Sequence, residues 1–193
     1  MFNLPKALLL GATILAGSGA AFAQDASMTL GENGKSASDF TTVMAAAEAA
    51  GLTEMLMGPG PYTIFAPSND AFKIADPAMI ADLMLPENRE HLVNFLQAHI
   101  ISGLYTSADL EKAIGAGTNP DAADNILKVV DGVIESESLA GTASHIFIRL
   151  NGDEFDISAD PANAVQAVIV TPDIMSSNGV VHVIDHVLSP VAF

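Results

Sequence analysis

Residues 62–72, YTIFAPSNDAF, constrain the fold more than any other stretch of the chain. Their first four residues alternate with the two-residue period of a β-strand. Pro67 ends the pattern, because proline has no N–H to donate to a strand ladder. The next three residues are Ser, Asn and Asp, whose side chains accept hydrogen bonds from the unpaired first amides of a helix. The segment therefore predicts a strand that turns directly into a helix.

A second informative stretch, residues 176–188, reads SSNGVVHVIDHVL. Asn178 and Gly179 are a turn signal, and the β-branched residues that follow favour a buried strand. Pro190 closes this run. The stretch predicts a strand over residues 180–188, near the end of the fold.

In the remaining pattern, helices come before strands. Helical spacing and caps predict helices at 40–52, 77–85, 87–101 and 108–114, with a turn at 58–61 and a loop at 115–125. Strand patterns occupy 126–130, the stretch from residue 133, 145–150, 153–158 and 165–170. Asp131-Gly132 and Asn151-Gly152 are the expected hairpin turns, and a helix over 124–139 competes with the first hairpin. This order predicts an α+β fold with segregated elements rather than alternating βαβ units.

The first 23 residues have the pattern of a signal peptide. Lys6 gives a positive start, residues 7–16 an apolar core, and Ala21-Phe22-Ala23 a small-x-small cleavage site. The apolar core is shorter than the roughly 20 residues that span a bilayer, and an uncleaved amphipathic helix is the alternative. The sequence thus predicts a signal peptide at 1–23, a flexible polar segment at 24–38, one domain at 39–190 and no transmembrane anchor after cleavage.

The chain is acidic and contains no cysteine. Loss of Lys6 with the leader leaves 6 basic against 23 acidic residues, a formal charge of −17. Nucleic acid and anionic lipid are both bound by clustered Lys and Arg, so the composition argues against both as partners. A cationic partner, mineral ions or simply a solvated surface fit the charge. Because no disulfide can form, we expect an exported chain to be stabilised by its core alone.

No motif in the sequence indicates catalysis or a metal centre. His182, Asp185 and His186 could bind a metal on a helix, but on a strand Asp185 points to the opposite face and one ion cannot bridge the three. The acidic run 151–160 lacks the spacing of an EF-hand and is better explained as a hairpin, with a surface calcium site as the alternative. No nucleophile elbow, phosphate loop or zinc-protease motif occurs. We therefore expect no metal, no cofactor and no enzyme activity.

Residues 62–72 and 176–188 resemble the two signature boxes of the fasciclin domain, a family of extracellular adhesion modules. Residues 39–56 and 85–110 are similar to the family's opening helix and to its central helix with the segment after it, so the resemblance covers 39–190. It implies a wedge-shaped β-sandwich with helices along one side. The box residues are Phe65, Ala66, Pro67, Ser68, Asn69, Asp70 and Phe72 in the first, and Asn178, Gly179, His182 and Asp185 in the second. We also expect one shared core between the boxes, formed by Phe65, Phe72, Leu96, Val181 and Ile184.

The resemblance also implies a role for His99. This residue stands at the histidine of the family's Tyr-His pair, which the family associates with core structure and with adhesion, but Ala98 takes the place of the tyrosine. A histidine on the apolar side of a helix must satisfy its ring nitrogens locally. We expect His99 to be a structural hydrogen-bonding residue, with Asp70 or Ser68 as its partner, and an adhesive contact is the alternative.

Asp173 and Ile174 resemble the Asp-Ile adhesion motif that some animal fasciclin domains present to integrins, although Ile174 can equally fill a core edge. The sequence as a whole predicts a secreted, periplasmic or cell-surface binding module for adhesion. Its expected partner is a protein or a cell surface, with weak self-association as a further expectation. A carrier of an apolar small molecule such as a carotenoid is the alternative, and a hydrolase is a weaker one.

Overall fold

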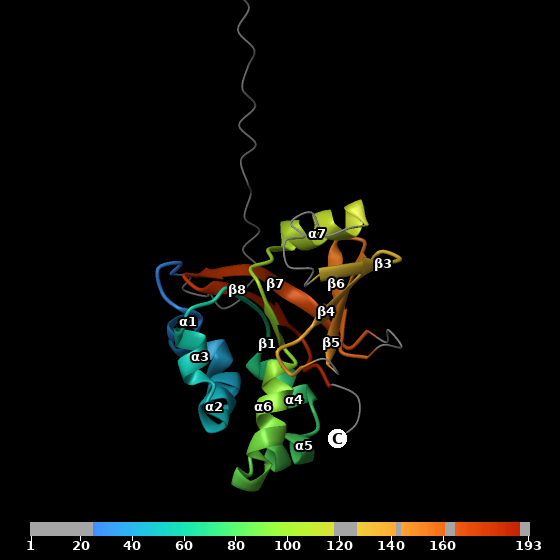
Figure 1. The fold of residues 1–193 in the computed structure, drawn as a ribbon. Helices are drawn as coiled ribbons and strands as arrows, with labels where there is room; N and C mark the ends of the chain where they lie inside the picture. Colours follow the sequence, from blue (N-terminus) through green and yellow to red (C-terminus); the bar gives the residue numbers. More distant parts are fainter. Residues whose placement is uncertain (1–24, 118–126, 142–143, 161–164, 190–193) are drawn as a thin grey trace, which may run out of the picture.

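The computed structural model describes residues 25–117, 127–141, 144–160 and 165–189, so the predicted signal peptide lies outside the described residues. The helices are α1 (Leu30–Ser36), η1 (Ser38–Phe40), α2 (Thr41–Ala50), α3 (Thr53–Met57), α4 (Asn69–Ile74), α5 (Pro77–Leu83), η2 (Pro86–Asn88), α6 (Arg89–Gln97) and α7 (Ser107–Ala116). The strands are β1 (Tyr62–Pro67), β2 (Ile100–Ser102), β3 (Leu127–Val130), β4 (Val133–Glu137), β5 (His145–Asn151), β6 (Glu154–Ser158), β7 (Ala167–Ser176) and β8 (Gly179–Ile184). Figure 1 shows α1 to α6 gathered on one side of the strands, with α7 at the other end. The predicted α+β class is confirmed.

The strands form one sheet in the order β2-β1-β8-β7-β6-β5-β4-β3. The β1–β8 pair is parallel, and the other pairs are antiparallel. Strand β7 joins the two halves, because its first residues pair with β6 and the rest pair with β8, with two register shifts along the β7–β8 pair. Ile101 of β2, the first strand in this order, forms a bridge with Ser138, which directly follows β4 near the other end of the order. The sheet therefore folds back on itself into the two layers of a sandwich.

The corner between β1 and α4 forms as the sequence predicts. β1 ends at Pro67, and Ser68 is the N-cap of α4, where its side chain accepts a hydrogen bond from the Ala71 N–H at 3.2 Å. This bond satisfies one of the first helical amides, which have no partner within the helix. The first signature box is thus a rigid strand-to-helix connection.

Three buried clusters replace the single core expected between the boxes. Phe65 and Ile184 belong to the cluster between the sheet layers, while Phe72 and Leu96 lie in a second cluster among α2, α4, α5 and α6. Val181 belongs to a third, which packs under α1 and η1. Successive residues of a strand point to opposite faces, so neighbours within one box separate into different clusters. The single-core prediction is wrong, although all five side chains are buried.

Residues 24–38 were expected to be a flexible, unpatterned segment, and this prediction is wrong for α1. Thr29 and Glu32 form a capping box at its start, with the Thr29 N–H donating to the Glu32 carboxylate at 2.8 Å. The Leu30 side chain is buried, and its N–H donates to Asn178 Oδ1 at 2.8 Å. The helix carries two glycines, each of which disfavours a helix by about 1 kcal/mol, so contacts with the rest of the fold stabilise it.

Other element boundaries differ from the sequence prediction. The strand expected over 165–170 continues to Ser176 as β7, and the strand expected over 180–188 already ends at Ile184 as β8. The helix expected over 87–101 ends at Gln97, and residues 100–102 form strand β2. The turn at Asp131-Gly132 is confirmed, and both residues have positive φ, so the competing helix is wrong. The other two turns lie one residue away from the expected pairs, at Gly152-Asp153 and Ser177-Asn178. Among the described residues, no helix is long and apolar enough to cross a membrane.

Candidate functional site

The two signature boxes lie side by side as the parallel strands β1 and β8. Phe65 is paired with His182 in this register, and their rings stack with centroids 5.5 Å apart. The imidazole of His182 is completely buried. Its Nδ1 accepts a hydrogen bond from the Asp173 backbone N–H at 3.3 Å, and its Nε2 donates to the Tyr105 carbonyl at 2.9 Å. Burial lowers the pKa of His182, so the ring is a neutral link between β7, β8 and the segment just before α7.

Asp173 lies at a bend in β7 with φ of +60°, in the left-handed region that few residues other than glycine adopt. Its carboxylate accepts a hydrogen bond from the Ser107 N–H at 2.7 Å and another from the Ser107 hydroxyl. Ser107 is the first residue of α7, so Asp173 satisfies a terminal helix amide. A carboxylate is also favourable at this positive end of a helix.

The next residue, Ile174, is buried under α1 with 3% of its surface exposed. The structure therefore fits the core-edge interpretation of this side chain, while the Asp173 side chain remains 36% exposed. The Asp-Ile pair is not displayed outward as a unit. Its role in adhesion stays a prediction.

Ser107, Asp173 and His182 are of the residue types that a hydrolase would need, but they are not connected as a catalytic triad. In a triad the histidine takes the proton of the serine hydroxyl. Here the serine hydroxyl donates to Asp173, and both His182 ring nitrogens bond to backbone groups. The cluster therefore connects α7 to the sheet and has no base directed at the serine.

His99 is buried and hydrogen-bonded, but not to the predicted residues of the first box. Its Nδ1 donates to the Phe95 carbonyl at 2.8 Å, and its Nε2 accepts from the Leu188 N–H at 2.9 Å. The ring also packs on Phe95, with centroids 5.1 Å apart. Complete burial lowers the pKa of His99 to about 4, so the ring is neutral at pH 7. Ala98 is fully buried as well, so the position of the family's tyrosine faces the core here.

Two asparagines of the boxes connect the N-terminal helices, Asn69 to one another and Asn178 to the sheet. Asn69 Oδ1 accepts from the Thr42 N–H at 3.0 Å, which links α4 to α2. Asn178 donates to the carbonyls of Leu56 and Gly58 at 3.0 and 2.7 Å while accepting from the Leu30 N–H. These two asparagines are therefore used to hold the fold together, whereas Asp70 of the first box is exposed and pairs with Lys73 of its own helix.

The histidine-rich end of the second box does not converge on a metal site. Strand β8 ends at Ile184, and His182 is buried while His186 is exposed. Asp185 accepts a hydrogen bond from the Val168 N–H at 2.8 Å and lies 3.0 Å from His186 Nδ1. Within the described ranges, no group of three or more His, Cys, Asp or Glu side chains could hold an ion. The expected hairpin at the acidic run 151–160 is present as β5 and β6.

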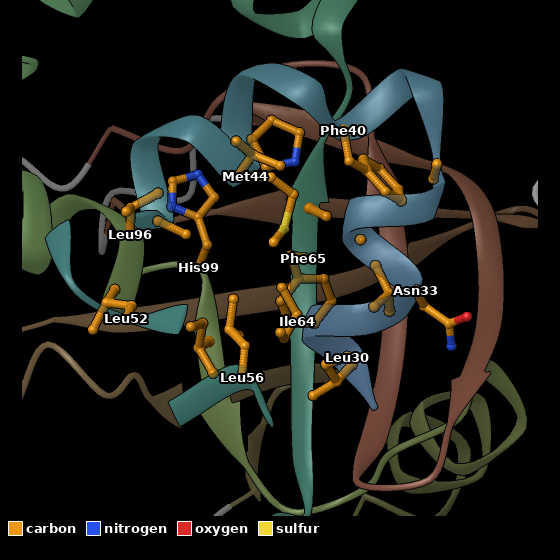
Figure 2. Close-up of a pocket in the computed structure, with 18 of the residues that line it drawn as sticks. Leu30, Asn33, Phe40, Met44, Leu52, Leu56, Ile64, Phe65, Leu96 and His99 are labelled. Atoms are coloured by element: carbon orange, nitrogen blue, oxygen red, sulfur yellow. The ribbon is translucent and has the colours of Figure 1, made fainter. Parts of the chain in front are cut away.

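A cavity of about 70 Å³ lies between the N-terminal helices and the β1 and β8 strands, and Figure 2 shows its apolar lining. Leu30, Met44, Leu56, Ile64 and Leu96 are among the side chains around it. Its polar neighbours are already satisfied: the Asn33 amide donates to Ser176 Oγ and to the Asp25 carbonyl, and His99 is bonded as described above. The cavity therefore offers dispersion contacts alone.

A second and larger hollow, which we call the α2–α5 groove, opens at the surface among α2, α4, α5 and α6. It measures about 330 Å³ and is lined by Thr41, Thr42, Ala45, Ala46, Phe72, Ile80, Leu83, Met84, Leu92 and Phe95. The sequence analysis did not find this groove. A signal existed in the run of alanines of α2, because small side chains facing another helix leave space between the two backbones.

Comparison with known proteins agrees with this fold. The family model of the fasciclin domain matches residues 38–190. Protein sll1483 of Synechocystis sp. is 33% identical over 168 residues, which cover 87% of this chain and 77% of that protein. Human periostin is 31% identical over 167 residues, which cover 86% of this chain but 16% of periostin. Among solved structures, a FAS1 domain pair from the insect cell adhesion molecule fasciclin I superposes with a TM-score of 0.63 at 18% identity, covering 84% of this chain and 51% of that one. The chain belongs to the fasciclin domain family.

Proposed function

We propose that this chain is an exported binding module that mediates cell-surface or matrix adhesion through protein–protein contacts. The observation that carries the proposal is the internal use of the polar side chains in both signature boxes. His182, Asn178 and Asn69 all bond within the fold, so these side chains of the boxes build a scaffold. A module of this kind acts through its outer surface. The insect protein that shares the fold is a cell adhesion molecule.

Charge and size indicate how such contacts work. A single small domain binds weakly, and many copies on one surface supply avidity. The formal charge of −16 for the whole chain opposes contact with other acidic surfaces. At about 0.15 M ionic strength, charges are screened beyond roughly 8 Å, so salt or divalent cations should promote attachment. The leader pattern at residues 1–23 supports export.

The experiment is deletion of the gene, with attachment to a surface and autoaggregation measured at several salt concentrations. The deletion strain should attach less, and purified protein should compete with attachment of the parent strain. Mass spectrometry of the envelope fraction should find Gln24, or its cyclised form, at the N-terminus. Normal attachment by the deletion strain at all salt concentrations would refute adhesion, and an intact Met1 would refute cleavage of the leader.

The carrier alternative gains no support from the cavity in Figure 2. Pockets for drug-sized ligands measure about 300–1,000 Å³, and a cavity that binds the much smaller benzene measures about 150 Å³. The cavity beneath α1 is about 70 Å³, so a carotenoid does not fit while α1 is in place. Absorbance of the purified protein separates the two functions, because a bound carotenoid colours it and an adhesion module is colourless.

A further inference from the structure

The α1 helix has the sequence of a segment that folds by docking. It is seven residues long and contains Gly31 and Gly34. Isolated helices shorter than about 12 residues are marginal in water, and each glycine weakens them further. The stability of α1 therefore comes from the surface on which it lies. We call this surface the α1 socket, and its residues are Met44, Leu56, Met57, Ser176, Asn178 and Val181.

The glycines that weaken the free helix also fit it to the socket. A Cβ atom at Gly31 would lie 2.9 Å from Met57 Cγ and 3.4 Å from Leu56 Cβ. A Cβ atom at Gly34 would lie 2.6 Å from Met44 Sδ. Contacts this short would force a neighbour to move, so the two glycines let the α1 backbone lie directly on α2 and α3. The sequence of α1 therefore suits a docked segment rather than an independent helix.

Two hydrogen bonds and one buried side chain fix the position of α1 on the socket. The Leu30 N–H donates to Asn178 Oδ1 at 2.8 Å, and the Asn33 amide donates to Ser176 Oγ at 2.9 Å. The Leu30 side chain is 3% exposed and belongs to the same buried cluster as Val181. Because the hydrogen bonds are directional, they define one position for any copy of this segment that occupies the socket.

The α1 helix does not fill its socket completely. The cavity of about 70 Å³ described above lies beneath it, and Figure 2 shows Leu30, Met44 and Leu56 around this space. Empty space next to an apolar side chain removes dispersion contacts from that side chain. The docked helix is therefore held less tightly than a fully packed one, and this lowers the cost of releasing it.

A single residue connects α1 to the rest of the fold. Ala37 is both the C-cap of α1 and the N-cap of η1, with φ of −91° and ψ of 123°. This extended conformation belongs to neither helix, so rotation about the Ala37 backbone re-aims α1 without changing α2. Cleavage after Ala23, as proposed above, leaves residues 24–36 as the free N-terminal end. A released α1 can then swing away from its own socket as a unit.

We propose that α1 exchanges between two copies of this chain, with residues 25–36 of each copy docked in the α1 socket of the other. The segment and the socket are the same in every copy, so each contact described above forms again in the dimer. Exchange of an identical element is for this reason a low-cost route to dimers. Both copies are acidic, with a formal charge of −16 for the whole chain, so screening by salt should favour the dimer.

This inference goes beyond the proposed adhesive function and rests on it only for removal of the leader. An exchanged dimer carries two copies of every outer surface. Two weak contacts can then act together on one partner surface, which supplies the avidity that a single domain lacks.

Disulfide trapping tests the exchange in purified residues 24–193, because the chain has no cysteine of its own. One preparation carries Gly31→Cys and the other Leu56→Cys. The 3.4 Å between the two Cβ positions is close to the span of a disulfide, about 3.5–4.5 Å. Chains with tags of different length are mixed, refolded together from urea and oxidised. In an exchanged dimer the two thiols meet between copies, so a mixed disulfide dimer should appear on a non-reducing gel.

Two controls distinguish exchange from chance collision and from misfolding. Gly31→Cys mixed with Ala108→Cys, at an exposed site on α7, should give several-fold less mixed dimer. Gly31→Cys and Leu56→Cys in a single chain should give an intrachain disulfide at low protein concentration, which shows that the substituted α1 still docks. If Gly31→Cys does not fold, Asn33→Cys and Ser176→Cys form the replacement pair, because their parent side chains are hydrogen-bonded. A docked pair that gives no more mixed dimer than the Ala108→Cys control would overturn the proposal.

A longer hinge should return the chain to the monomer. Insertion of Gly-Ser-Gly-Ser between Ala37 and Ser38 lets α1 fold back onto its own socket, whereas the same insertion before Asp25 leaves the hinge unchanged. Size-exclusion chromatography with light scattering should find a parent dimer whose fraction rises with protein and salt concentration. The hinge insertion should reduce this fraction several-fold, and the other insertion should not. A parent that stays monomeric at all concentrations, or a dimer insensitive to the hinge insertion, would overturn the proposal.

The exchange and the adhesive function can fail separately, because trapping and chromatography use purified chains and do not depend on attachment. Normal attachment by the deletion strain would refute adhesion and leave a trapped dimer standing. A chain that is monomeric and gives no trapped dimer, in a strain whose attachment depends on the gene, would refute the exchange alone.

Discussion

Lowering the pH from about 7.5 to about 5 should destabilise the folded chain through the buried histidines. His99 donates one hydrogen bond and accepts another, and both need the neutral ring. Its pKa is lowered from 6.5 to about 4 by burial, so between these values the unfolded chain binds a proton that the folded chain does not. The free energy of unfolding must then fall as the pH falls, because protons stabilise the state that binds them.

The size of the effect follows from the two pKa values. A difference of one pKa unit corresponds to about 1.4 kcal/mol, so the full shift of His99 corresponds to about 3 kcal/mol below pH 4. Between pH 7.5 and 5, this histidine becomes protonated in the unfolded chain and stays mostly neutral in the folded chain. The free energy of unfolding therefore falls by about 2 kcal/mol over this interval. The pKa of His182 is lowered in the same direction and adds to the slope. A loss of this size is a large part of the roughly 5–15 kcal/mol that stabilises a typical domain.

The assay is urea unfolding, followed by circular dichroism at pH 7.5, 6.5, 5.5 and 5. His99→Gln should be less stable than the parent at pH 7.5 and should lose a large part of the pH dependence, whereas His91→Gln, at an exposed position, should keep it. The carboxyl groups of Asp25 and Glu32, whose pKa values are lowered by hydrogen bonds from Ser27 and Thr29, lose their stabilising effect only at lower pH. A parent protein equally stable at pH 7.5 and 5, or a His99→Gln variant with the full pH dependence, would refute the reasoning.

Three further substitutions test the architecture. Phe65→Ala removes a fully buried ring from between the sheet layers and should cost about 3–5 kcal/mol in urea unfolding; a cost under 1 kcal/mol would contradict its place in the core. Asn178→Ala should cost about 1–3 kcal/mol and expose the segment at Leu30 to limited proteolysis, because three hydrogen bonds between the helices and the sheet are lost. Asp173→Ala should cost about 1 kcal/mol, because the amide of Ser107 loses its acceptor, and unchanged stability combined with lost attachment would identify Asp173 as an adhesive contact instead.

The parts of the fold that the sequence predicts are those determined locally. Pro67 and Ser68 mark the strand-to-helix corner by their own backbone and side-chain chemistry, and Asp131-Gly132 marks a turn that needs positive φ at both positions. The segregation of helices and strands follows from the same local signals. The α1 helix could not be predicted in this way, because its glycine-rich sequence has weak helix propensity and its stability comes from distant partners such as Asn178.

The candidate sites were harder to predict because they depend on contacts between distant segments. His99 was expected to be buried and hydrogen-bonded, and it is, but its partner Leu188 lies 89 residues away and carries no side-chain signal for this bond. The α2–α5 groove is open because Ala45 and Ala46 in its lining are small, where larger side chains would fill the space next to Ile80. A periodic pattern indicates which residues face inward, but it does not indicate where two facing helices leave space.

The central claim, that this fasciclin domain is an adhesive module, is tested most directly by a bead assay. Beads coated with purified residues 24–193 are applied to cells of the deletion strain, and bound beads are counted against beads coated with albumin. Our account predicts more bound beads than for albumin, competition by soluble protein, and stronger binding when salt screens the acidic surfaces. Coated beads that bind no better than albumin beads at any salt concentration, together with a coloured ligand that copurifies with the protein, would contradict adhesion and favour a carrier.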